Sequence, residues 1–529
     1  MSPVPAGQPS AAAGAAASTG TAANARAAGG SSFRERVEEA LRRCVPGSAG
    51  LAPGKDSLVQ MSGSASNFLY RVDVETAEGG RRRLCLRCAQ HAQFGIPHSV
   101  EADVMRAARE QGAVVPEVCG VLPPGDLLGS GFFMAWVEGE GRGEKIAAAF
   151  AEHGAGSQLG RQCGETLARI QSIGVESLPP LPVGPPTPLR YLASLRKQYD
   201  SVRICRPALE YTFAWLEAHA PAECQEERPV LVHGDFRSAN IMAHPERGLA
   251  GVIDWELVHL GNRYEDIGWI CVRTWRYGML HKFVGGFAGL SDFCKGYEAA
   301  GGAPVDHAMV WWWALAGSVR WSILCLQQGA NFRADSARFE NGVVGRRACE
   351  GELDCLITIA EAAGGVDAVL ASAEGVEGEV GVEEPRRERM AEDSGFPAGE
   401  ELVLGAQRLL SAQVLSALTA AGDVRNAFLV RVVNNALGMV ARSLRMGPSA
   451  DRAEASKWSA VALARLLGPG AADADSLSAL RRVLAAGLRS GQVPLERPGL
   501  LRHLLVCTGR QALMDQPKYA SLATLQSKF

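Results

Sequence analysis

The stretch from residue 231 to residue 266 constrains the fold of this chain more than any other, because polar side chains there follow short apolar runs. An apolar pair leads through a His-Gly dipeptide into Asp235, and Asn240 comes five residues after this aspartate. A second apolar run, at 251–253, ends on Asp254. Short apolar runs bounded by glycine and polar residues are typical of strands. The stretch therefore predicts two strand–loop segments, joined by a turn, that carry three oxygen-bearing side chains.

The spacing of these side chains fits phosphoryl transfer. This reaction needs a carboxylate that orients a hydroxyl nucleophile, together with amide and carboxylate oxygens that bind Mg²⁺. The pattern H-x-D-x-x-x-x-N, from His233 to Asn240, has the spacing of a kinase catalytic loop, and Asp254 falls where the metal-binding aspartate of that fold lies. The pattern alone is short enough to arise by coincidence, so the rest of the chain decides its meaning.

Composition and charge exclude several classes of protein. The 529 residues are enough for two or three domains, and a net charge of -3 gives no reason to expect nucleic acid or an anionic membrane as partner. The 13 cysteines are scattered through apparent helices and strands, which favours a reducing compartment and a cytoplasmic location. The most apolar run, 311–326, is interrupted by Arg320 and predicts a buried helix.

The chain divides into five parts by composition and periodicity. Residues 1–31 are small and almost uncharged, and we expect a disordered tail, with an organelle transit peptide as the alternative. The segment 371–399 is rich in glycine and glutamate and predicts a solvated linker. Residues 400–529 carry apolar residues at helical spacing and predict about five helices in an α-helical bundle. Between the tail and the linker we expect two lobes, 32–140 and 141–370.

The pattern from residue 57 to residue 138 is rich in strands. A small-residue loop at 62–67 lies between two expected strands, where backbone N–H groups can approach phosphate oxygens. A strand that carries Arg87 follows, then a helix with Glu101 in its first turn, then a strand at 132–137. This is the order of elements in the small lobe of a kinase. The combination is far more specific than any of its parts.

Residues from about 55 to 360 resemble the aminoglycoside-phosphotransferase-like family, and within it the branch that is also fused to some acyl-CoA dehydrogenases. The resemblance rests on the stretches SGSASNFLYRV, LCLRCA, FFMAWVEGE, HGDFRSANIM and VIDWELVHLGNRYEDIGW. It implies an α+β two-lobed protein-kinase-like fold, with an antiparallel-sheet small lobe and a helical large lobe, followed by a separate all-α helical bundle. The C-terminal segment, with VVNNALGMVARSLRMG and DQPKY, resembles a helical domain of unknown function found beside such kinases.

The resemblance implies roles for the matching residues around the catalytic loop. Asp235 would orient the acceptor hydroxyl and receive its proton, and Arg237 would reach toward the transferred phosphate. Asn240 and Asp254 would hold Mg²⁺, which bridges the phosphates of ATP. Asp266 would cap the backbone of the loop.

The resemblance also implies a nucleotide site in the small lobe. Arg87 would pair with Glu101, at a position where kinases commonly have lysine, and arginine can hold phosphate through two N–H bonds. The remaining contacts to ATP would come from the small-residue loop, with Gly63, Ser64, Ser66 and Asn67, and from the inter-lobe hinge, with Met134, Trp136 and Val137.

Several residues allow two interpretations that the sequence leaves open. His233 either supports the loop or acts as an acid–base group, and we favour the architectural role. Glu256 either assists metal placement or forms a surface ion pair. Trp275 and Arg276 either line the acceptor pocket or contribute packing together with a surface ion pair. Asn434 and Asn435 are unusual inside a helix and predict a buried hydrogen-bond network or an inter-helix cap. A substrate-capture or dimerisation module is the alternative for the C-terminal domain.

Together these residues predict an ATP- and Mg²⁺-dependent kinase that phosphorylates a hydroxyl of a small-molecule metabolite. The resemblance to the dehydrogenase-fused branch suggests a hydroxyacyl-CoA or a hydroxy acid as the acceptor. An aminoglycoside-type antibiotic kinase is the alternative within the same chemistry. A nucleotide-binding pseudokinase or scaffold, whose helical domain forms homo-oligomers or recruits a partner, is the alternative from another class. No nucleic acid or membrane partner is expected.

Overall fold

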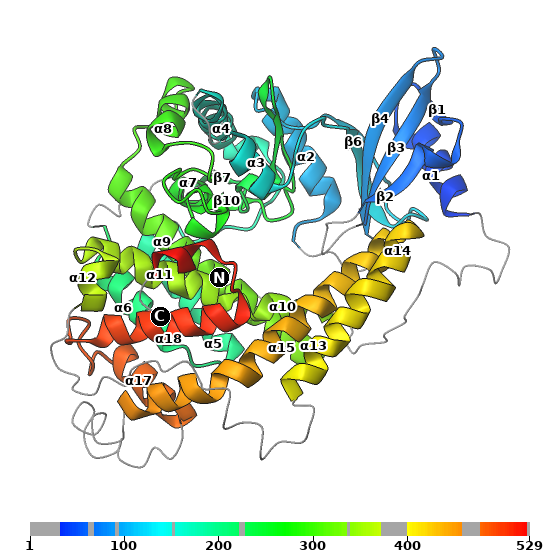
Figure 1. Ribbon diagram of the computed structural model, residues 1–529. Coiled ribbons are helices and arrows are strands. Elements are labelled where there is room, and N and C mark those ends of the chain that lie inside the picture. The colour runs from blue at the N-terminus through cyan, green and yellow to red at the C-terminus, as the bar shows by residue number, and fades with distance from the viewer. Residues whose placement is uncertain are drawn as a thin grey trace, which may run out of the picture.

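The structure is a computed structural model that contains a small lobe with a sheet, a helical large lobe and a helical C-terminal segment (Figure 1). It describes residues 32–61, 68–89, 95–150, 154–221, 228–335, 339–371, 399–457 and 477–525. The tail predicted at 1–31 lies outside these ranges, as does nearly all of the linker predicted at 371–399.

An antiparallel sheet forms the small lobe (Figure 1). Its strands run in the order β1-β3-β4-β6-β5, and β2 also pairs with β3. They are β1 (Ser48–Leu51), β2 (Leu58–Met61), β3 (Phe68–Thr76), β4 (Arg81–Ala89), β5 (Val118–Val121) and β6 (Ser130–Ala135). Two helices flank the sheet, α1 (Phe33–Cys44) and α2 (His98–Glu110). Ser32 begins α1 through a capping box with Glu35, which satisfies the first free N–H groups of the helix.

Strand β4 carries the predicted cation to one side of this sheet. Leu84 and Leu86 are fully buried in the cluster that the sheet forms with α1. Successive side chains of a strand point to opposite faces, so Arg87 lies on the other face. There it pairs with Glu101 of α2. The alternation of side chains along β4 therefore places the Arg87 guanidinium on the face of the sheet opposite to Leu84 and Leu86.

The large lobe is mainly helical, and with the antiparallel small lobe it confirms the predicted kinase-like fold. Its helices are α3 (Gly143–Phe150), α4 (Ala155–Gln171), α5 (Pro188–Val202), α6 (Pro207–Ala218), α7 (Tyr264–Ile270), α8 (Leu290–Ala299), α9 (His307–Ala334), α10 (Phe339–Gly345), α11 (Ala348–Ala362) and α12 (Val366–Ala371). Two short antiparallel sheets pair β7 (Val230–Val232) with β10 (His259–Gly261), and β8 (Ile241–His244) with β9 (Gly248–Val252). The 3-10 turns η3 (Ser238–Asn240) and η4 (Arg273–Arg276) lie beside these elements in sequence.

Helix α9 is a core helix of the large lobe. Among the described residues it alone is long and apolar enough to cross a membrane by length and composition, and 78% of its most apolar window is buried inside the protein. Trp312 and Trp313 are buried, whereas Trp311 is 44% exposed. The most apolar run of the sequence is therefore a buried helix, as predicted.

The C-terminal segment is helical, as predicted. Its helices are α13 (Gly399–Leu409), α14 (Ser416–Ala420), α15 (Val424–Lys457), α17 (Leu477–Arg489) and α18 (Leu500–Asp515), followed by the 3-10 turn η7 (Ala520–Thr524). The π-helical turn η5 (Leu410–Leu415) joins α13 to α14, and together they form a long hairpin with α15 (Figure 1).

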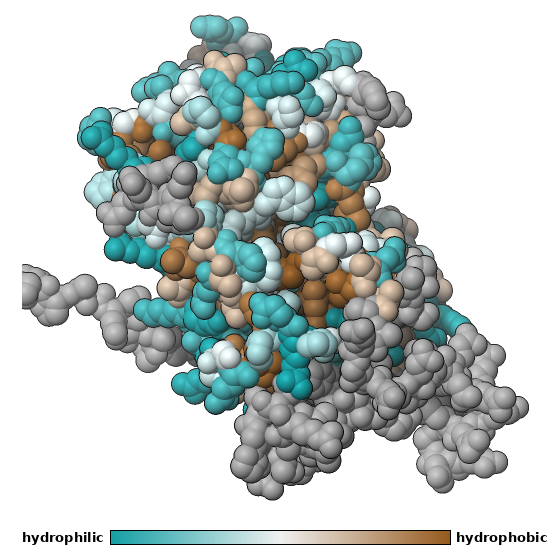
Figure 2. All heavy atoms as spheres, turned by 90° about the vertical axis from the view of Figure 1, so that its left-hand side faces the viewer, coloured by the Kyte–Doolittle hydropathy of each residue, from teal (hydrophilic) through white to brown (hydrophobic). Residues whose placement is uncertain are grey.

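The separation predicted for this bundle does not extend to its last helices. Helix α17 packs on α6, and α18 packs on α11. Leu484, Leu505 and Leu522 belong to the same hydrophobic core as the large lobe. An amphipathic helix is stable only when its apolar face is covered, and here the large lobe covers it. On the side shown in Figure 2, apolar residues reach the surface mainly at mid-height, between hydrophilic side chains.

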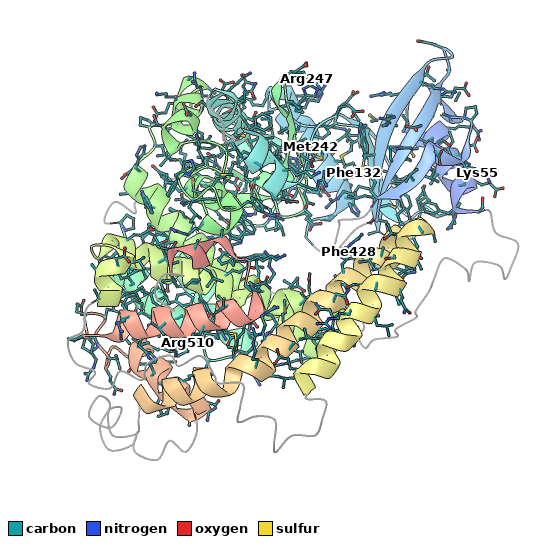
Figure 3. All side chains as sticks on the ribbon, viewed as in Figure 1. Lys55, Phe132, Met242, Arg247, Phe428 and Arg510 are labelled. Atoms are coloured by element: carbon teal, nitrogen blue, oxygen red, sulfur yellow. The ribbon has the colours of Figure 1, made fainter. Side chains whose placement is uncertain are left out.

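In the α13–α15 hairpin, Asn434 is buried, but the network predicted for it is only partly buried, because Ser411 is exposed and Asn434 Oδ1 has no hydrogen-bond partner among the described residues. Asn434 Nδ2 donates to Ser411 Oγ at 2.8 Å, and Gln407 Nε2 donates to the Asn434 carbonyl at 2.8 Å. Ser411 lies in η5, so this network ties α15 to the π-helical turn. Near the tip of the hairpin, Phe428 is 43% exposed (Figure 3). The dimerisation role considered for this segment stays a prediction.

Candidate active site

The predicted catalytic loop follows β7 and leads into η3, and its central residue is Asp235. Trp269 Nε1 donates to Asp235 Oδ1 at 2.7 Å, and Arg237 Nε donates to the same oxygen at 3.0 Å. Asn240 Nδ2 donates to Oδ2 at 2.6 Å. Hydrogen bonds to a carboxylate from a cation or a polarised N–H are short and strong, so these donors fix both oxygens. The side chain keeps 16% of its surface exposed and stays within reach of a substrate.

The backbone of this loop is held from α7 and α9. Asp266 accepts hydrogen bonds from the backbone N–H groups of His233 at 2.7 Å and Gly234 at 3.0 Å, which confirms its predicted capping role. Burial raises the pKa of the Asp266 carboxyl to about 7, and the two N–H bonds act in the opposite direction. From α9, Arg320 Nη2 donates to the Gly234 carbonyl at 2.7 Å. Three buried hydrogen bonds thus determine the path of the loop.

His233 is an architectural residue, as predicted. It is fully buried, its Nδ1 accepts the Asp235 N–H at 3.2 Å, and its Nε2 lies 3.2 Å from the Ile253 carbonyl. These partners require a proton on Nε2 and none on Nδ1, which is the neutral ring. Burial lowers the pKa of His233 to about 4, so the ring stays neutral at physiological pH.

Arg87 joins the small lobe to the metal-binding segment. Its guanidinium is buried and pairs with Glu101 at 3.3 Å, with Asp254 at 2.8 Å and with Glu256 at 2.7 Å. The predicted Arg87–Glu101 pair is therefore present, and Glu256 forms a buried ion pair in place of the surface pair considered from sequence. A planar guanidinium can serve three carboxylates at once, which a lysine ammonium on this strand could not do with the same geometry.

A backbone hydrogen bond joins the segments that carry Asn240 and Asp254. Ile253 donates its N–H to the Asn240 carbonyl at 3.0 Å, and the next residue, Asp254, has a left-handed φ of 69°. Such a backbone is strained for a residue other than glycine, and strain of this kind gathers at functional sites.

The donor set and the charge of this region fit Mg²⁺. Four carboxylates face only two guanidinium groups, because Arg87 pairs with three carboxylates and Arg237 with Asp235. Within the described ranges no group of three or more His, Cys, Asp or Glu residues could hold a metal by itself. Protein-bound Mg²⁺ commonly uses only one or two carboxylates and completes its shell with water and phosphate oxygens. One carboxylate and one amide oxygen are therefore a sufficient protein contribution.

The residues predicted to contact ATP are only partly described by the structure. Gly63, Ser64, Ser66 and Asn67 lie outside the described ranges, between β2 and β3, and their role stays a prediction. The hinge residues Met134, Trp136 and Val137 lie at the end of β6 and directly after it. The chain then crosses to the large lobe, where Glu140 and Ala243 exchange backbone hydrogen bonds of 2.8 and 2.9 Å. The residues predicted as the hinge therefore lie between the small lobe and the large lobe. Their contact with adenine stays a prediction.

The structure separates the two residues that were considered for the acceptor pocket. The Arg237 guanidinium lies 4.8 Å from the ring centre of Trp275, so Trp275 packs directly against the catalytic loop. Arg276 is buried elsewhere and donates to the carbonyls of Cys271 at 2.7 Å and Leu280 at 3.1 Å. Both residues are buried, Trp275 against the catalytic loop and Arg276 away from it, and an acceptor-pocket role for Trp275 stays a prediction.

Sequence reasoning missed Trp269. Trp269 is the last residue of the stretch VIDWELVHLGNRYEDIGW, and the sequence assigned it no function. In the structure it donates a hydrogen bond directly to Asp235. The signal was its spacing from Asp266, because residues three apart on a helix share a face. Both side chains point from α7 to the catalytic loop.

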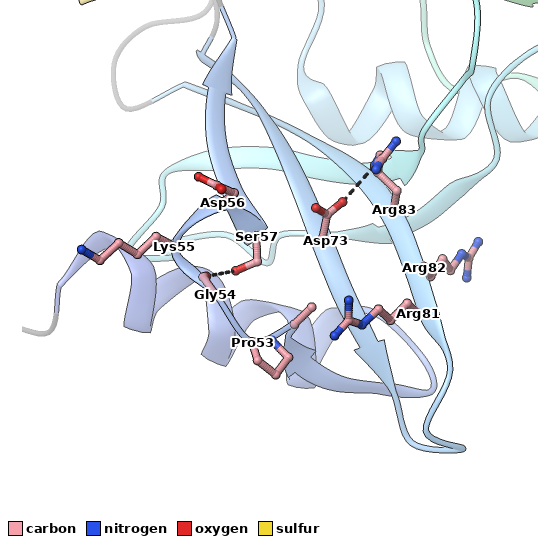
Figure 4. A pocket seen from close by; sticks show the side chains of 10 residues that line it. Pro53, Gly54, Lys55, Asp56, Ser57, Asp73, Arg81, Arg82 and Arg83 are labelled. Carbon is pink, nitrogen blue, oxygen red and sulfur yellow. Dashed lines mark hydrogen bonds and ion pairs between the residues drawn. The ribbon is translucent and has the colours of Figure 1, made fainter. Parts of the chain in front are cut away.

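A cavity of about 370 Å³ lies away from this site, in the small lobe (Figure 4). It is lined by Lys55, Asp56, Asp73 and the run Arg81 to Arg83, and two of these residues, Arg83 and Asp73, form an ion pair of 2.9 Å. None of the catalytic-loop residues lines it, so it is not the acceptor site.

The geometry is that of a kinase-type phosphotransferase, in which an oriented aspartate, the residues Asn240 and Asp254 and a buried Arg–Glu pair come together. Comparison with known families agrees with this class. Residues 58–300 match the phosphotransferase enzyme family, and this part of the chain is a domain of that family. Residues 420–519 match a domain of unknown function.

Two curated relatives carry a similar stretch. Acyl-CoA dehydrogenase family member 10 of Mus musculus is 26% identical over 245 residues, which are 44% of this chain and 22% of that protein. Acyl-CoA dehydrogenase family member 11 of Gallus gallus is 29% identical over 243 residues, which are 44% of this chain and 30% of that protein. The similarity thus covers less than a third of either relative.

Solved structures show weaker likeness. A putative aminoglycoside phosphotransferase from Ralstonia eutropha has 21% identity and a TM-score of 0.45, with 60% of this chain and 95% of that chain covered. An ethanolamine kinase of Plasmodium vivax has 13% identity and a TM-score of 0.37, with 62% of this chain and 96% of that chain covered. Scores of this size add nothing to the family match.

Proposed function

We propose that this chain uses ATP and Mg²⁺ to phosphorylate a hydroxyl group of a hydroxy acid or a hydroxyacyl-CoA. The observation that carries the proposal is the meeting of Asp235, Asn240 and Asp254 with the Arg87–Glu101 pair. Phosphoryl transfer is catalysed mainly by positioning and by stabilising charge, and these residues supply both.

The mechanism gives each residue of the loop a separate task. Asp235 accepts the hydrogen bond of the acceptor hydroxyl and takes its proton late in the transfer, and its orientation is fixed by the donors on both of its oxygens. Arg237 keeps a positive charge beside the reacting groups. Asn240 and Asp254 would hold Mg²⁺, which supplies positive charge to the phosphates of ATP.

The acids of α11 support an anionic acceptor over an aminoglycoside. A kinase that binds a polycation needs carboxylates that are free to meet it. Here Glu350 is paired with Arg347 at 2.9 Å, and Glu352 with Arg206 at 2.6 Å. Asp354 is fully occupied by hydroxyl donors, as described below. These buried carboxylates are thus already ion-paired or hydrogen-bonded inside the protein.

The named relatives point to the same class of acceptor. Both are called acyl-CoA dehydrogenases, and the stretch that matches this chain lies in them beside a much longer remainder. A phosphotransferase domain joined to an acyl-CoA enzyme is suited to an acyl-CoA that carries a hydroxyl group. This transfer of substrate class is part of our proposal, as is a cytoplasmic location.

A panel of acceptors tests the proposal. Turnover of Mg·ATP would be measured with hydroxy acids, hydroxyacyl-CoAs and aminoglycosides, each beside a no-acceptor control. We expect stimulation by a hydroxy acid or hydroxyacyl-CoA and none by aminoglycosides. Stimulation by aminoglycosides alone would establish the antibiotic-kinase alternative. Nucleotide binding without stimulation by any acceptor would favour the pseudokinase.

A further inference from the structure

The end of the chain returns to the neighbourhood of the catalytic loop. The turn η7 follows α18 and contacts α11 (Figure 1). Leu522 and Leu525 are buried in the core of the large lobe. Just before these leucines in sequence, the hydroxyls of Tyr519 and Ser521 both donate to Asp354 of α11, the latter at 2.6 Å. The C-terminal segment is therefore attached to the lobe by specific polar contacts as well as by apolar packing.

Asp354 connects this segment to η4. Its carboxylate is 1% exposed, and Thr274 Oγ1 donates to the oxygen that Tyr519 also contacts, at 3.1 Å. The Thr274 and Tyr519 hydroxyls lie 3.1 Å apart. Removing one hydroxyl leaves a buried carboxylate oxygen of Asp354 with fewer hydrogen bonds, and this lowers the stability of the folded protein. The hydroxyls of Thr274, Tyr519 and Ser521 therefore depend on one another.

The turn η4 in turn contacts the catalytic loop. Ser238 Oγ donates to the Trp275 carbonyl at 3.2 Å. The Trp275 ring lies below the Arg237 guanidinium, with 4.8 Å between them, and it meets the Trp269 ring edge-on with 5.4 Å between centres. Arg237 and Trp269 are the two donors to Asp235 Oδ1.

The position of the Trp275 ring depends on the anchoring of η4. The ring is 4% exposed, and its Nε1 has no hydrogen-bond partner within the part of the chain that the structure describes. No hydrogen bond of its own therefore fixes the ring. The ring packs against Trp269 and Trp321, and its place among them depends on its backbone, which is held at Thr274 on one side. On the other side, Tyr277 has a left-handed φ of 45°, a strained conformation that persists only when its surroundings enforce it.

We propose that the segment 516–525 is a positioning element of the active site. Tyr519 and Ser521, through Asp354 and Thr274, hold η4 so that Trp275 keeps Arg237 and Trp269 on Asp235. Tyr519, Ser521 and Asp354 act through other residues and are positioning residues. The inference rests on the proposed catalytic role of Asp235. It gives the helical domain of unknown function a task, because its end completes the scaffold of the catalytic loop.

The C-terminal helical segment offers a matched control at a second contact with the large lobe, outside residues 516–525. The Tyr211 hydroxyl of α6 donates to the Leu495 carbonyl at 3.4 Å. Tyr211→Phe removes one hydroxyl between the same two parts of the molecule, but α6 supplies none of the side chains that contact Asp235. An effect of the C-terminal segment on overall stability would appear in both variants. An effect on positioning would appear only at the Tyr519 contact.

The test compares the double variant Tyr519→Phe/Ser521→Ala with Tyr211→Phe in the full-length protein labelled with 5-fluorotryptophan. The ¹⁹F resonances of Trp269 and Trp275 are assigned by Trp→Phe replacement, and turnover of Mg·ATP is measured with the best acceptor. We expect the double variant to displace both resonances and to lower kcat about tenfold or more, since small misplacements of catalytic groups are costly. The KM for ATP should stay unchanged, and Tyr211→Phe should resemble the wild type.

The proposal is overturned when both resonances and kcat of the double variant match those of Tyr211→Phe. Failure of the proposed function gives a different result. A wild-type protein without Mg·ATP turnover would contradict the proposed function, and the ¹⁹F resonances alone would then decide whether the C-terminal segment positions the loop.

Discussion

At the scale of single residues, Arg87 and His259 show how buried charge is matched in this protein. Arg87 serves three carboxylates on two lobes. His259 has an acceptor at each ring nitrogen, with the Leu257 carbonyl at 2.9 Å from Nδ1 and the Glu265 carboxylate at 3.0 Å from Nε2. Two acceptors require two N–H donors, so the ring carries a positive charge.

Replacing Arg87 tests the cost of leaving these carboxylates unpaired. We expect Arg87→Ala to lower the free energy of unfolding by about 3–5 kcal/mol, as found when one partner of a buried ion pair is removed. Arg87→Lys keeps the positive charge but loses the planar set of N–H donors of the guanidinium. It should therefore lower the free energy of unfolding less than Arg87→Ala does, and it should raise the KM for ATP. Urea unfolding measures the first effect and steady-state kinetics the second. An Arg87→Ala protein as stable as the wild type would show that the cluster is not a stabilising contact.

His259 predicts a dependence of stability on pH. Burial alone would lower the pKa of His259, but the Glu265 carboxylate outweighs it and raises the pKa from 6.5 to about 9. The stabilisation is therefore complete below pH 6.5 and is lost as the pH rises through 9. We expect the difference in unfolding free energy between wild type and His259→Gln to shrink across that range. A difference that is equal at pH 6 and pH 9 would contradict the charged ring.

At the scale of elements, the sequence predicted those parts that follow from local rules. The period of β4, the helix with Glu101 and the catalytic loop could be placed because side-chain alternation and motif spacing are local. The contact of Trp275 with Arg237 could not, because it depends on how η4 is held by α11. Helix α7 could be predicted only in part. Its periodicity places Asp266 and Trp269 on one face, but the sequence does not show that this face contacts the catalytic loop.

Trp269→Phe tests the contribution of α7 to catalysis. The change removes the N–H donor to Asp235 and keeps a ring in the Trp cluster, so we expect kcat to fall about tenfold, the worth of one hydrogen bond to a charged group. Trp313→Phe is the matched control, because Trp313 is buried and its Nε1 has no hydrogen-bond partner in the described ranges. Equal kcat in the two variants would show that the Trp269 bond does not contribute to turnover.

At the scale of the whole molecule, the C-terminal segment could be predicted as helical but not as part of the large lobe. The spacing of apolar residues in this segment shows that each helix has an apolar face that must be covered. The spacing does not show which part of the protein covers that face. In the structure, Arg489 of α17 pairs with Glu210 at 2.7 Å and with Asp200 at 2.6 Å. These contacts join residues 279 and 289 positions apart, a separation that no local pattern can encode.

Truncation tests this integration. We expect a chain ending at residue 371 to aggregate or to lose cooperative unfolding, because removing α17 and α18 exposes the apolar core they cover. Removal of residues 1–31 is the control, and from its composition we expect no change in melting temperature. A soluble truncated chain with the melting temperature of the full-length protein would show that the lobes fold without these helices.

The most direct test of the catalytic assignment is the rate of acceptor phosphorylation by Asp235→Asn. The replacement keeps the shape of the side chain and removes the proton acceptor. We predict that kcat falls about 10²–10⁴-fold, the usual contribution of a general base, while ATP still binds. An Asp235→Asn protein that phosphorylates its acceptor at the wild-type rate would contradict the assignment.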